Sequence, residues 1–305
     1  MSRAKPSSAG LQSLLRSLKL PTFVERYEEV AEAATREGWS FEDYLRQLAE
    51  LEASERQGRR IERLRKQSGL PTEKTMASLD QDRLPAKVRR QLPALCDGSL
   101  LDDAVNVLAF GLPGRGKTHL LCAIGHELIT RGHRVLFRPT ALFVQQLLMA
   151  KRELRLEQEF KRLDRYAAVI LDDIGYVQQD REEMEVLFTF FAARYERRSV
   201  LVTSNLLFSE WERIFKDPMT TAAAIDRLVH HSVILELIGP SIREEEAKAR
   251  NRSPESSPAG GQIAKPAQES PRAGTPRPGK TAKKSPRARR PATKRRTQKA
   301  RRRAS

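Results

Sequence analysis

The chain has 305 residues, enough for one large domain or two ordinary ones, and its 39% hydrophobic content is enough to form a buried core. Most of the net charge of +17 belongs to residues 251–305, which carry 17 Lys and Arg against two Glu. A tail this cationic is typical of proteins that bind a polyanion, most often nucleic acid. Two cysteines, Cys96 and Cys122, exclude a disulfide framework, and the lack of an apolar signal core or of ~18 consecutive apolar residues predicts a cytoplasmic protein without a membrane span.

Residues 1–103 are predicted to form a small helical domain. Leucines recur there with the period of one helix face, at Leu11, Leu14, Leu15 and Leu18. A second pattern of helical period covers residues 23–37. Ser40 and Asp43 have the spacing of a capping box and predict the start of a long helix.

That helix is expected to end before Gly69 and Pro71, which are stop signals. Its second half is rich in cations, at Arg56, Arg59, Arg60, Arg63, Arg65 and Lys66. Such a run usually marks a solvated face. The region is therefore either a helical bundle without chemistry of its own or a surface that lies along DNA phosphates.

Residues 104–246 alternate between short apolar runs and helical patterns. The apolar runs predict strands at 105–110, 134–138, 167–171, 200–203 and 233–237. The segments between them predict helices at 118–130, 141–163 and 182–197. This alternation predicts an α/β core in three layers, with a parallel sheet covered by helices on both faces.

A phosphate-binding loop occupies residues 111–118, whose sequence Gly-Leu-Pro-Gly-Arg-Gly-Lys-Thr matches the pattern at every fixed position. Its glycines let successive backbone N–H groups point at phosphate oxygens. Lys117 is expected to reach the β- and γ-phosphates, and the Thr118 hydroxyl to bind Mg²⁺. The predicted ATP-binding residues are Gly111, Pro113, Gly114, Arg115, Gly116, Lys117, Thr118 and His119.

Polar side chains follow two further strands. Asp172 and Asp173 end an apolar strand about 55 residues after the loop. Asp172 is predicted to hold Mg²⁺, and Asp173 to polarise the attacking water. Asn205 ends the next strand, where its amide would either touch the γ-phosphate or make a local turn.

Arg227 precedes the last predicted strand and is a candidate arginine finger for a neighbouring subunit, the alternative being an ordinary ion pair with Asp226. His230 and His231 are potential metal ligands. The sequence places no third ligand near them, which favours packing beside the strand.

Together these residues resemble the IstB-like helper ATPases of bacterial insertion sequences, within the AAA+ class and close to the DnaC helicase loaders. The resemblance covers residues 11–243 and rests on Gly-Lys-Thr-His at 116–119, Arg-Tyr-Glu at 194–196, Thr-Ser-Asn at 203–205, and Asp-Arg-Leu at 226–228 followed by the two histidines. It implies ATP hydrolysis, DNA binding, a transposase partner and a homo-oligomer with ATP sites between subunits. It also implies that Arg227 acts as a finger in trans.

Three features depart from the family pattern. Asp173 stands where many relatives carry Glu, which shortens the base by one methylene. The terminal motif of the family usually reads Ser-Tyr-Arg followed by a basic residue, whereas this chain has Ile242 before Arg243 and Glu244 after it. No nucleotide role is therefore assigned to Arg243. Residues 247–305 are rich in Pro, Ser and cations and are predicted to be disordered. The short segment before them leaves no room for the helical lid of many AAA+ proteins.

The sequence thus predicts an ATP-dependent, DNA-binding helper of transposition. A DnaC-like loader acting on a replicative helicase is the alternative within the family. A chromatin-like DNA binder that uses only its tail is the alternative outside it, although the intact Lys117, Thr118 and Asp172 argue against a degenerate nucleotide site.

Overall fold

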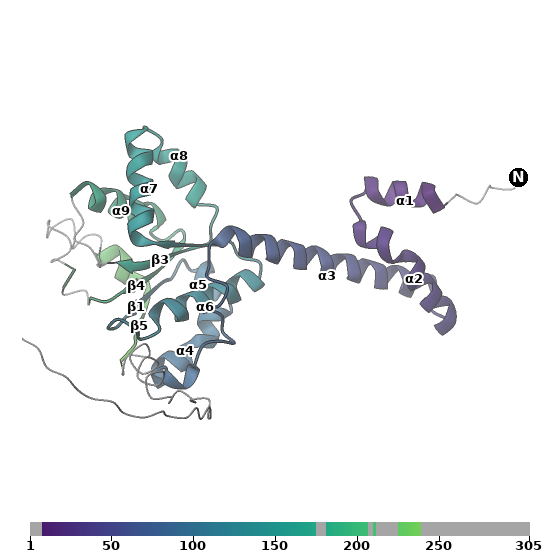
Figure 1. Cartoon of the computed structure of the whole chain (residues 1–305), viewed down its shortest axis with the longest axis horizontal. Coiled ribbons are helices and arrows are strands. Elements are labelled where there is room, and N and C mark those ends of the chain that lie inside the picture. The colour runs from purple at the N-terminus through teal and green to yellow at the C-terminus, as the bar shows by residue number, and fades with distance from the viewer. Residues whose placement is uncertain (1–7, 175–180, 207–209, 212–224, 239–305) are drawn as a thin grey trace, which may run out of the picture. The chain divides into compact units, whose positions relative to one another are not determined.

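The computed structural model describes residues 8–174, 181–206, 210–211 and 225–238 (Figure 1). The chain divides into two units, Met1–Pro254 and Glu255–Ser305, and every described residue belongs to the first. The predicted tail, Arg243 and the segment predicted to lack a lid lie outside the described residues. None of the described helices has the length and apolar character needed to cross a membrane.

Three helices begin the chain: α1 (Ser8–Ser17), α2 (Pro21–Glu37) and α3 (Phe41–Ser68). The predicted cap of α3 is confirmed, because Ser40 Oγ accepts a hydrogen bond of 3.0 Å from the backbone N–H of Asp43. The predicted end is confirmed as well, since Gly69 caps α3 in the left-handed conformation, with φ 72°.

One buried carboxylate joins α2 to α3. Glu52 accepts a hydrogen bond of 2.9 Å from the Thr22 backbone N–H and pairs with Arg56 at 3.0 Å and Arg59 at 3.5 Å. Burial alone would raise the pKa of Glu52, but the hydrogen bonds from Thr22 and Arg56 outweigh it and hold that pKa below its usual value. Two of the cations of α3 are therefore engaged within the protein.

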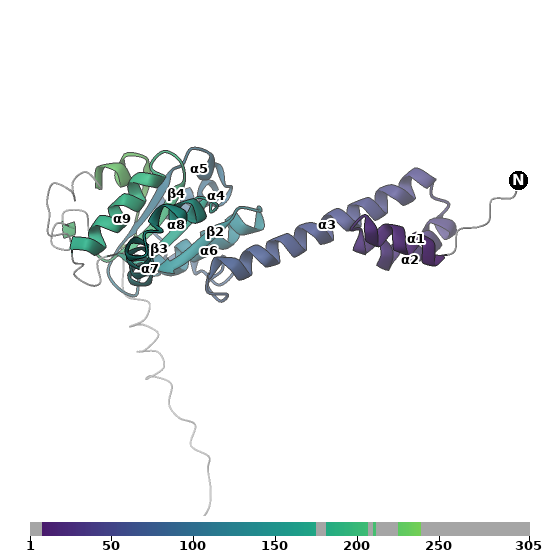
Figure 2. The same cartoon turned by 90° about the horizontal axis from the view of Figure 1, so that it is seen from above.

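Within the described residues, five parallel strands form one sheet in the order β2-β3-β4-β1-β5, of which Figure 2 labels β2, β3 and β4. They are β1 (Asn106–Phe110), β2 (Val135–Pro139), β3 (Ala168–Ile174), β4 (Ser199–Ser204) and β5 (Ser232–Glu236). All four neighbouring pairs are parallel, which confirms the predicted sheet. The carboxyl ends of all five strands consequently lie on the same side of the sheet, where β1, β4 and β3 are neighbours.

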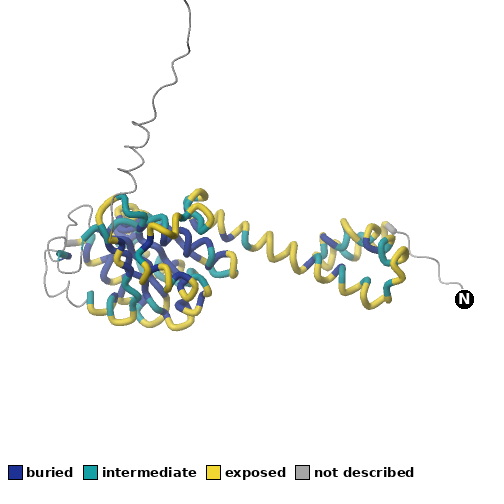
Figure 3. The backbone as a smooth tube through the Cα atoms, turned by 90° about the horizontal axis from the view of Figure 1, so that it is seen from below, coloured by how far each residue is buried: buried dark blue, intermediate teal, exposed yellow. Residues whose placement is uncertain are grey.

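Helices cover both faces of this sheet, as the sequence predicts. One face carries α4 (Ala86–Cys96), α5 (Ser99–Asp102) and α6 (Lys117–Thr130), and the last turns of α3 join it through Leu64. The other face carries α7 (Thr140–Arg152), α8 (Leu156–Leu163) and α9 (Arg181–Arg194). Figure 3 shows the buried residues concentrated in these layers, whereas much of α3 is exposed.

The domain boundary at residue 103 stays a prediction. Two helices on its N-terminal side pack into the same hydrophobic cluster as β1 and α6, through Val88, Leu92 and Leu95 of α4 and Leu100 and Leu101 of α5. One face of the sheet is thus covered partly by residues that the sequence alone groups with the N-terminal helices.

The single helix predicted over 141–163 is wrong, because the structure has two helices there, α7 and α8. Leu154 interrupts them with a positive φ of 58°, which no Gly or Pro in the segment announces. The break lets α8 turn Phe160 and Leu163 back onto the core, where the rings of Phe160 and Phe190 lie 6.3 Å apart. Tertiary packing therefore overrides the continuous helical pattern.

Candidate active site

The phosphate-binding loop lies between the end of β1 and the start of α6. Gly111 has φ 152° and runs so close to the end of β5 that an added Cβ would lie 2.5 Å from the Leu237 carbonyl oxygen, so only glycine fits there. Gly114 and Gly116 also have positive φ, 78° and 81°. These glycines therefore allow the curved backbone that a phosphate-binding loop requires.

Lys117 is the buried cation of the loop. It is 6% exposed, and its Nζ donates to the carbonyl oxygens of Gly111 at 2.7 Å and Leu112 at 3.0 Å. A third hydrogen bond, of 2.5 Å, reaches Asn205 Oδ1 at the end of β4. The ammonium is thus held at the mouth of the loop, beside the amide that the sequence selects as a candidate γ-phosphate contact.

Asp172 joins the loop helix to two strands. Its Oδ1 accepts from the Thr118 hydroxyl at 2.8 Å and from the Thr203 hydroxyl of β4 at 2.7 Å. Its backbone carbonyl accepts from the Thr140 hydroxyl at 2.9 Å. A hydroxyl and a carboxylate oxygen brought together in this way fit the oxygen ligands that Mg²⁺ prefers.

Asp173 sits at an irregularity of β3. The pairing of β3 with β4 shifts register between Leu171 and Ile174, and Asp173 has φ 65°, a conformation that costs energy in any residue but glycine. Its backbone N–H donates to Thr203 Oγ1 at 2.7 Å, and its Oδ1 accepts from Asn205 Nδ2 at 2.9 Å. The bulge therefore aims the second carboxylate at Asn205.

These contacts form one polar network at the carboxyl edge of β1, β4 and β3. Asn205 is its centre, since its Oδ1 accepts from Lys117 and its Nδ2 donates to Asp173. Neutral amide and hydroxyl groups link the charged side chains, so the Lys117 ammonium and the carboxylates of Asp172 and Asp173 are held within one site. This arrangement is suited to binding and cleaving a phosphoanhydride.

Thr140 is a site residue that the sequence does not single out, and Thr203 appears there only as part of the Thr-Ser-Asn motif, without a role of its own. Thr203 is 1% exposed and binds both Asp172 and the Asp173 backbone. A buried hydroxyl one or two residues before the end of an apolar strand is a usable signal, but only once the neighbouring strand is known. His119, which the sequence predicts to bind ATP, contacts the segment after α3, with Nε2 3.1 Å from Ser78 Oγ and 3.2 Å from the Thr75 carbonyl.

Comparison with known proteins shows the family of this chain. Residues 13–250 match the family described as IstB-like ATP binding protein. The chain belongs to this family. Its parallel sheet, covered by helices on both faces, is the layered α/β core expected from the sequence.

Similar proteins come from several bacterial insertion sequences. An insertion sequence ATP-binding protein of Sinorhizobium fredii is 45% identical, over 80% of this chain and 82% of that protein. The IS5376 ATP-binding protein of Geobacillus stearothermophilus is 37% identical, over 76% and 92%. The IS21 ATP-binding protein of Pseudomonas aeruginosa is 36% identical, over 78% and 90%. Among solved structures, DnaI aligns with a TM-score of 0.47 and 17% identity, over 56% of this chain and 96% of that one.

In this IstB-like chain, Arg227 lies far from the phosphate loop. It belongs to the helical residues 225–230, which precede β5, and the neighbouring Leu228 carbonyl accepts from Asn106 Nδ2 at 3.1 Å. Asn106 is the first residue of β1, whereas the phosphate loop follows the last residue of that strand. The length of β1, about 13 Å, therefore separates Asn106 from the loop. Among the described residues, no ion pair joins Arg227 to Asp226.

The family motif at 194–196 folds against the two histidines. Tyr195 OH and His230 Nδ1 are 3.0 Å apart, and His231 Nε2 lies 3.5 Å from Glu196 Oε1. The expectation that no third candidate ligand lies near the histidines is wrong, since Glu196 lies next to them. Both histidines are exposed, and the His230 ring packs against that of Tyr195. The sequence hides this contact because more than thirty residues separate the two motifs.

Proposed function

We propose that this IstB-like protein hydrolyses ATP, binds DNA and assists insertion-sequence transposition together with the transposase of the same element. The observation that carries the proposal is the single network of Lys117, Asn205 and Asp173, with Thr118 and Asp172 beside it. Relatives at 45% and 37% identity are ATP-binding proteins of insertion sequences. Because bacterial DNA lies in the cytoplasm, we place the protein there.

The residues of the network have distinct tasks in ATP hydrolysis. Lys117 would exchange its carbonyl contacts for the β- and γ-phosphate oxygens, and the positive-φ glycines would direct backbone N–H groups at them. Thr118 and Asp172 would hold Mg²⁺, which neutralises phosphate charge when it is bound with the nucleotide. Asp173 would accept the proton of the attacking water, and Asn205 would orient that water or the γ-phosphate.

We expect Asp173→Asn to bind ATP normally and to lose turnover by ~100-fold or more, the size of a general-base contribution. The substitution is nearly isosteric, and Asn tolerates the left-handed backbone of this position better than other residues do. A flipped amide can still accept from Asn205 Nδ2. Nucleotide binding and phosphate release are therefore measured separately on the same preparation.

Glu185→Gln is the matched control, because Glu185 is an exposed acid whose partner is Lys151 on the protein surface. It is expected to change neither quantity. Equal loss of binding and turnover in Asp173→Asn would remove Asp173 from the role of base.

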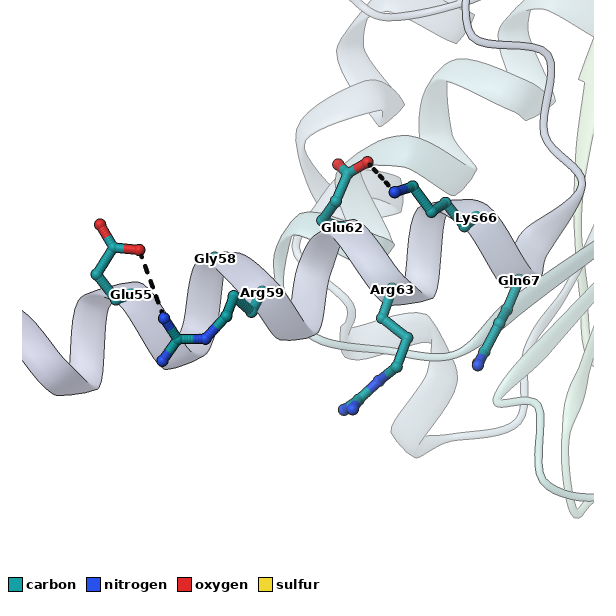
Figure 4. Close-up of a pocket in the computed structure, with 7 residues that line it drawn as sticks. All are labelled: Glu55, Gly58, Arg59, Glu62, Arg63, Lys66 and Gln67. Atoms are coloured by element: carbon teal, nitrogen blue, oxygen red, sulfur yellow. Dashed lines mark ion pairs between the residues drawn. The ribbon is translucent and has the colours of Figure 1, made fainter. Parts of the chain in front are cut away.

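DNA would contact the cationic face of α3 as well as the tail. A groove of about 510 Å³ on this helix is lined by Glu55, Gly58, Arg59, Glu62, Arg63, Lys66 and Gln67 (Figure 4). Arg59 and Lys66 pair with acids of the same helix at 3.8 Å and 3.6 Å. Within the described residues Arg63 has no ion-pair partner, and its side chain extends away from both pairs (Figure 4). Arg63 is thus the cation of this face best placed for a phosphate.

Deletion of residues 251–305 is expected to weaken DNA binding at low salt and to flatten its salt dependence, while basal ATPase activity persists. The deleted residues carry 17 cations, and each phosphate neutralised on duplex DNA contributes about −0.9 to the slope of log affinity against log salt. Fluorescence anisotropy with duplex DNA over a salt series measures that slope.

A chain with a scrambled tail of the same composition is the control, and it should keep the original slope if the tail is a non-specific tether. An unchanged slope after deletion would show that the tail has another task. Regulation by phosphorylation is then the candidate, because five Ser and Thr residues of the tail precede a proline, namely Ser253, Ser257, Ser270, Thr275 and Ser285.

DNA-stimulated turnover tests the proposal as a whole. A chromatin-like binder that uses only its tail would show no turnover, with or without DNA. A DnaC-like loader would instead act on a replicative helicase, so pull-down of purified transposase against purified helicase separates the two ATPase functions. Capture of the helicase but not the transposase would replace transposition by loading.

A further inference from the structure

A second cluster of side chains that can bind metal ions lies at the amino ends of the strands, whereas the ATP site lies at their carboxyl ends. Glu196 follows α9, whereas His230 and His231 precede β5, and each offers one ligand atom within 4.8 Å of the others. Five histidines occur in the chain, and these two are neighbours both in sequence and in space. Their rings meet edge to face with centroids 4.5 Å apart.

The hydrogen bonds around the cluster resemble those of a metal site. His231 Nε2 already lies 3.5 Å from Glu196 Oε1. His230 Nδ1 lies 3.0 Å from the Tyr195 hydroxyl, and a partner on the second ring nitrogen is what orients metal-binding imidazoles. Three atoms each ~2.1 Å from a shared ion stand about 3.4 Å apart, so small side-chain rotations would complete the site.

A rigid support underlies Glu196. Two residues earlier, the buried guanidinium of Arg194 donates to the carbonyl oxygens of Leu163 at 3.1 Å, Tyr166 at 3.0 Å and Ser199 at 3.0 Å. It therefore ties the end of α9 to the segments that begin β3 and β4. Glu196 itself is held at φ 54°, a conformation that fixes where its side chain leaves the backbone.

We propose that Glu196, His230 and His231 bind a divalent transition-metal ion of the Zn²⁺ class. Two imidazoles and one carboxylate form a ligand set that Zn²⁺ accepts, whereas Mg²⁺ and Ca²⁺ prefer oxygen ligands alone. All three side chains are exposed, so the ion would complete its coordination with water.

The ion would fasten the end of α9 to helical residues 225–230. That helical turn carries Arg227 three residues before His230 and four before His231. Metal binding would thus hold the proposed finger in a defined position at the subunit surface. This consequence rests on the proposed function, whereas binding of the ion does not.

Equilibrium dialysis of the untagged full-length protein against Zn²⁺, with excess Mg²⁺ present, tests the site. We expect one equivalent of Zn²⁺ to bind, with His231→Ala and Glu196→Gln each weakening affinity at least about tenfold. The two thiols should interfere little near neutral pH, because burial raises the pKa of Cys96 to about 11 and of Cys122 to about 12. His133→Ala is the matched control, since His133 lies beside Gly98, away from the cluster, and should leave binding unchanged.

Thermal unfolding gives a second readout that does not depend on ATP hydrolysis. Zn²⁺ should raise the melting temperature of the wild type and of His133→Ala, but not that of His231→Ala or Glu196→Gln. Glu196→Gln keeps the size of an exposed side chain, so it serves if His231→Ala fails to fold. Unchanged Zn²⁺ affinity in a folded Glu196→Gln or His231→Ala protein would overturn the site. Wild-type Zn²⁺ binding with no effect of the ion on DNA-stimulated ATPase would leave the site standing and remove only its link to Arg227.

Discussion

Lys117→Ala is expected to abolish productive ATP binding, with a loss of affinity of at least ~100-fold. The buried ammonium donates hydrogen bonds to the carbonyl oxygens of Gly111 and Leu112 and to Asn205 Oδ1, and in the proposed ATP complex it would bind the β- and γ-phosphates. One charged hydrogen bond contributes about 1.5–3 kcal/mol, so loss of the contacts to two phosphates accounts for this factor. Removal of the ammonium also leaves Asn205 Oδ1 without that donor.

Titration with a fluorescent ATP analogue measures this loss, and thermal unfolding without nucleotide shows whether the variant is folded. Lys151→Ala provides the control, because Lys151 is a surface lysine that pairs with Glu185 at 3.0 Å. It should bind ATP as the wild type does. A folded Lys117→Ala protein that retains wild-type affinity would contradict the assignment of the whole site.

Arg227→Ala is expected to lose ~10³-fold in DNA-stimulated turnover while ATP binding within a subunit persists. The charge that develops on the transferred phosphoryl group needs stabilisation, and an arginine finger supplies a factor of this order. The phosphate loop follows the carboxyl end of β1, whereas Arg227 lies near its amino end and is badly placed to reach the nucleotide of its own chain. The proposed finger would therefore act on the nucleotide of another subunit.

Mixing of two inactive proteins tests whether the finger acts in trans. Arg227→Ala retains the phosphate loop and Lys117→Ala retains the finger, so some mixed interfaces would pair an intact loop with an intact finger. Recovery of ATPase activity in the mixture is the expected result. Arg89→Ala, which removes a surface arginine paired with Asp82, should be fully active alone. Full DNA-stimulated turnover in Arg227→Ala would end both the finger assignment and the oligomeric mechanism.

The sequence by itself determined the local features of the ATP site and most of the fold. The phosphate loop depends on glycines, Lys117 and Thr118 within eight consecutive residues, so its pattern is readable without tertiary information. The strands are apolar because both faces of the sheet are covered, and that burial appears directly in the sequence. The caps of α3 were readable for the same reason, since Ser40 and Gly69 act on their own helix.

Only the tertiary structure decided which distant residues meet. The hydrogen bonds of Asn205 to Lys117 and Asp173 exist because β4 lies between β1 and β3, and strand order is not encoded in any local pattern. Thr203 became a site residue through the same neighbour relation. The break at Leu154 also arises from packing between segments, because it lets apolar side chains of α8 be buried in the core. The contact of Glu196 with the two histidines likewise joins segments that are distant in the sequence.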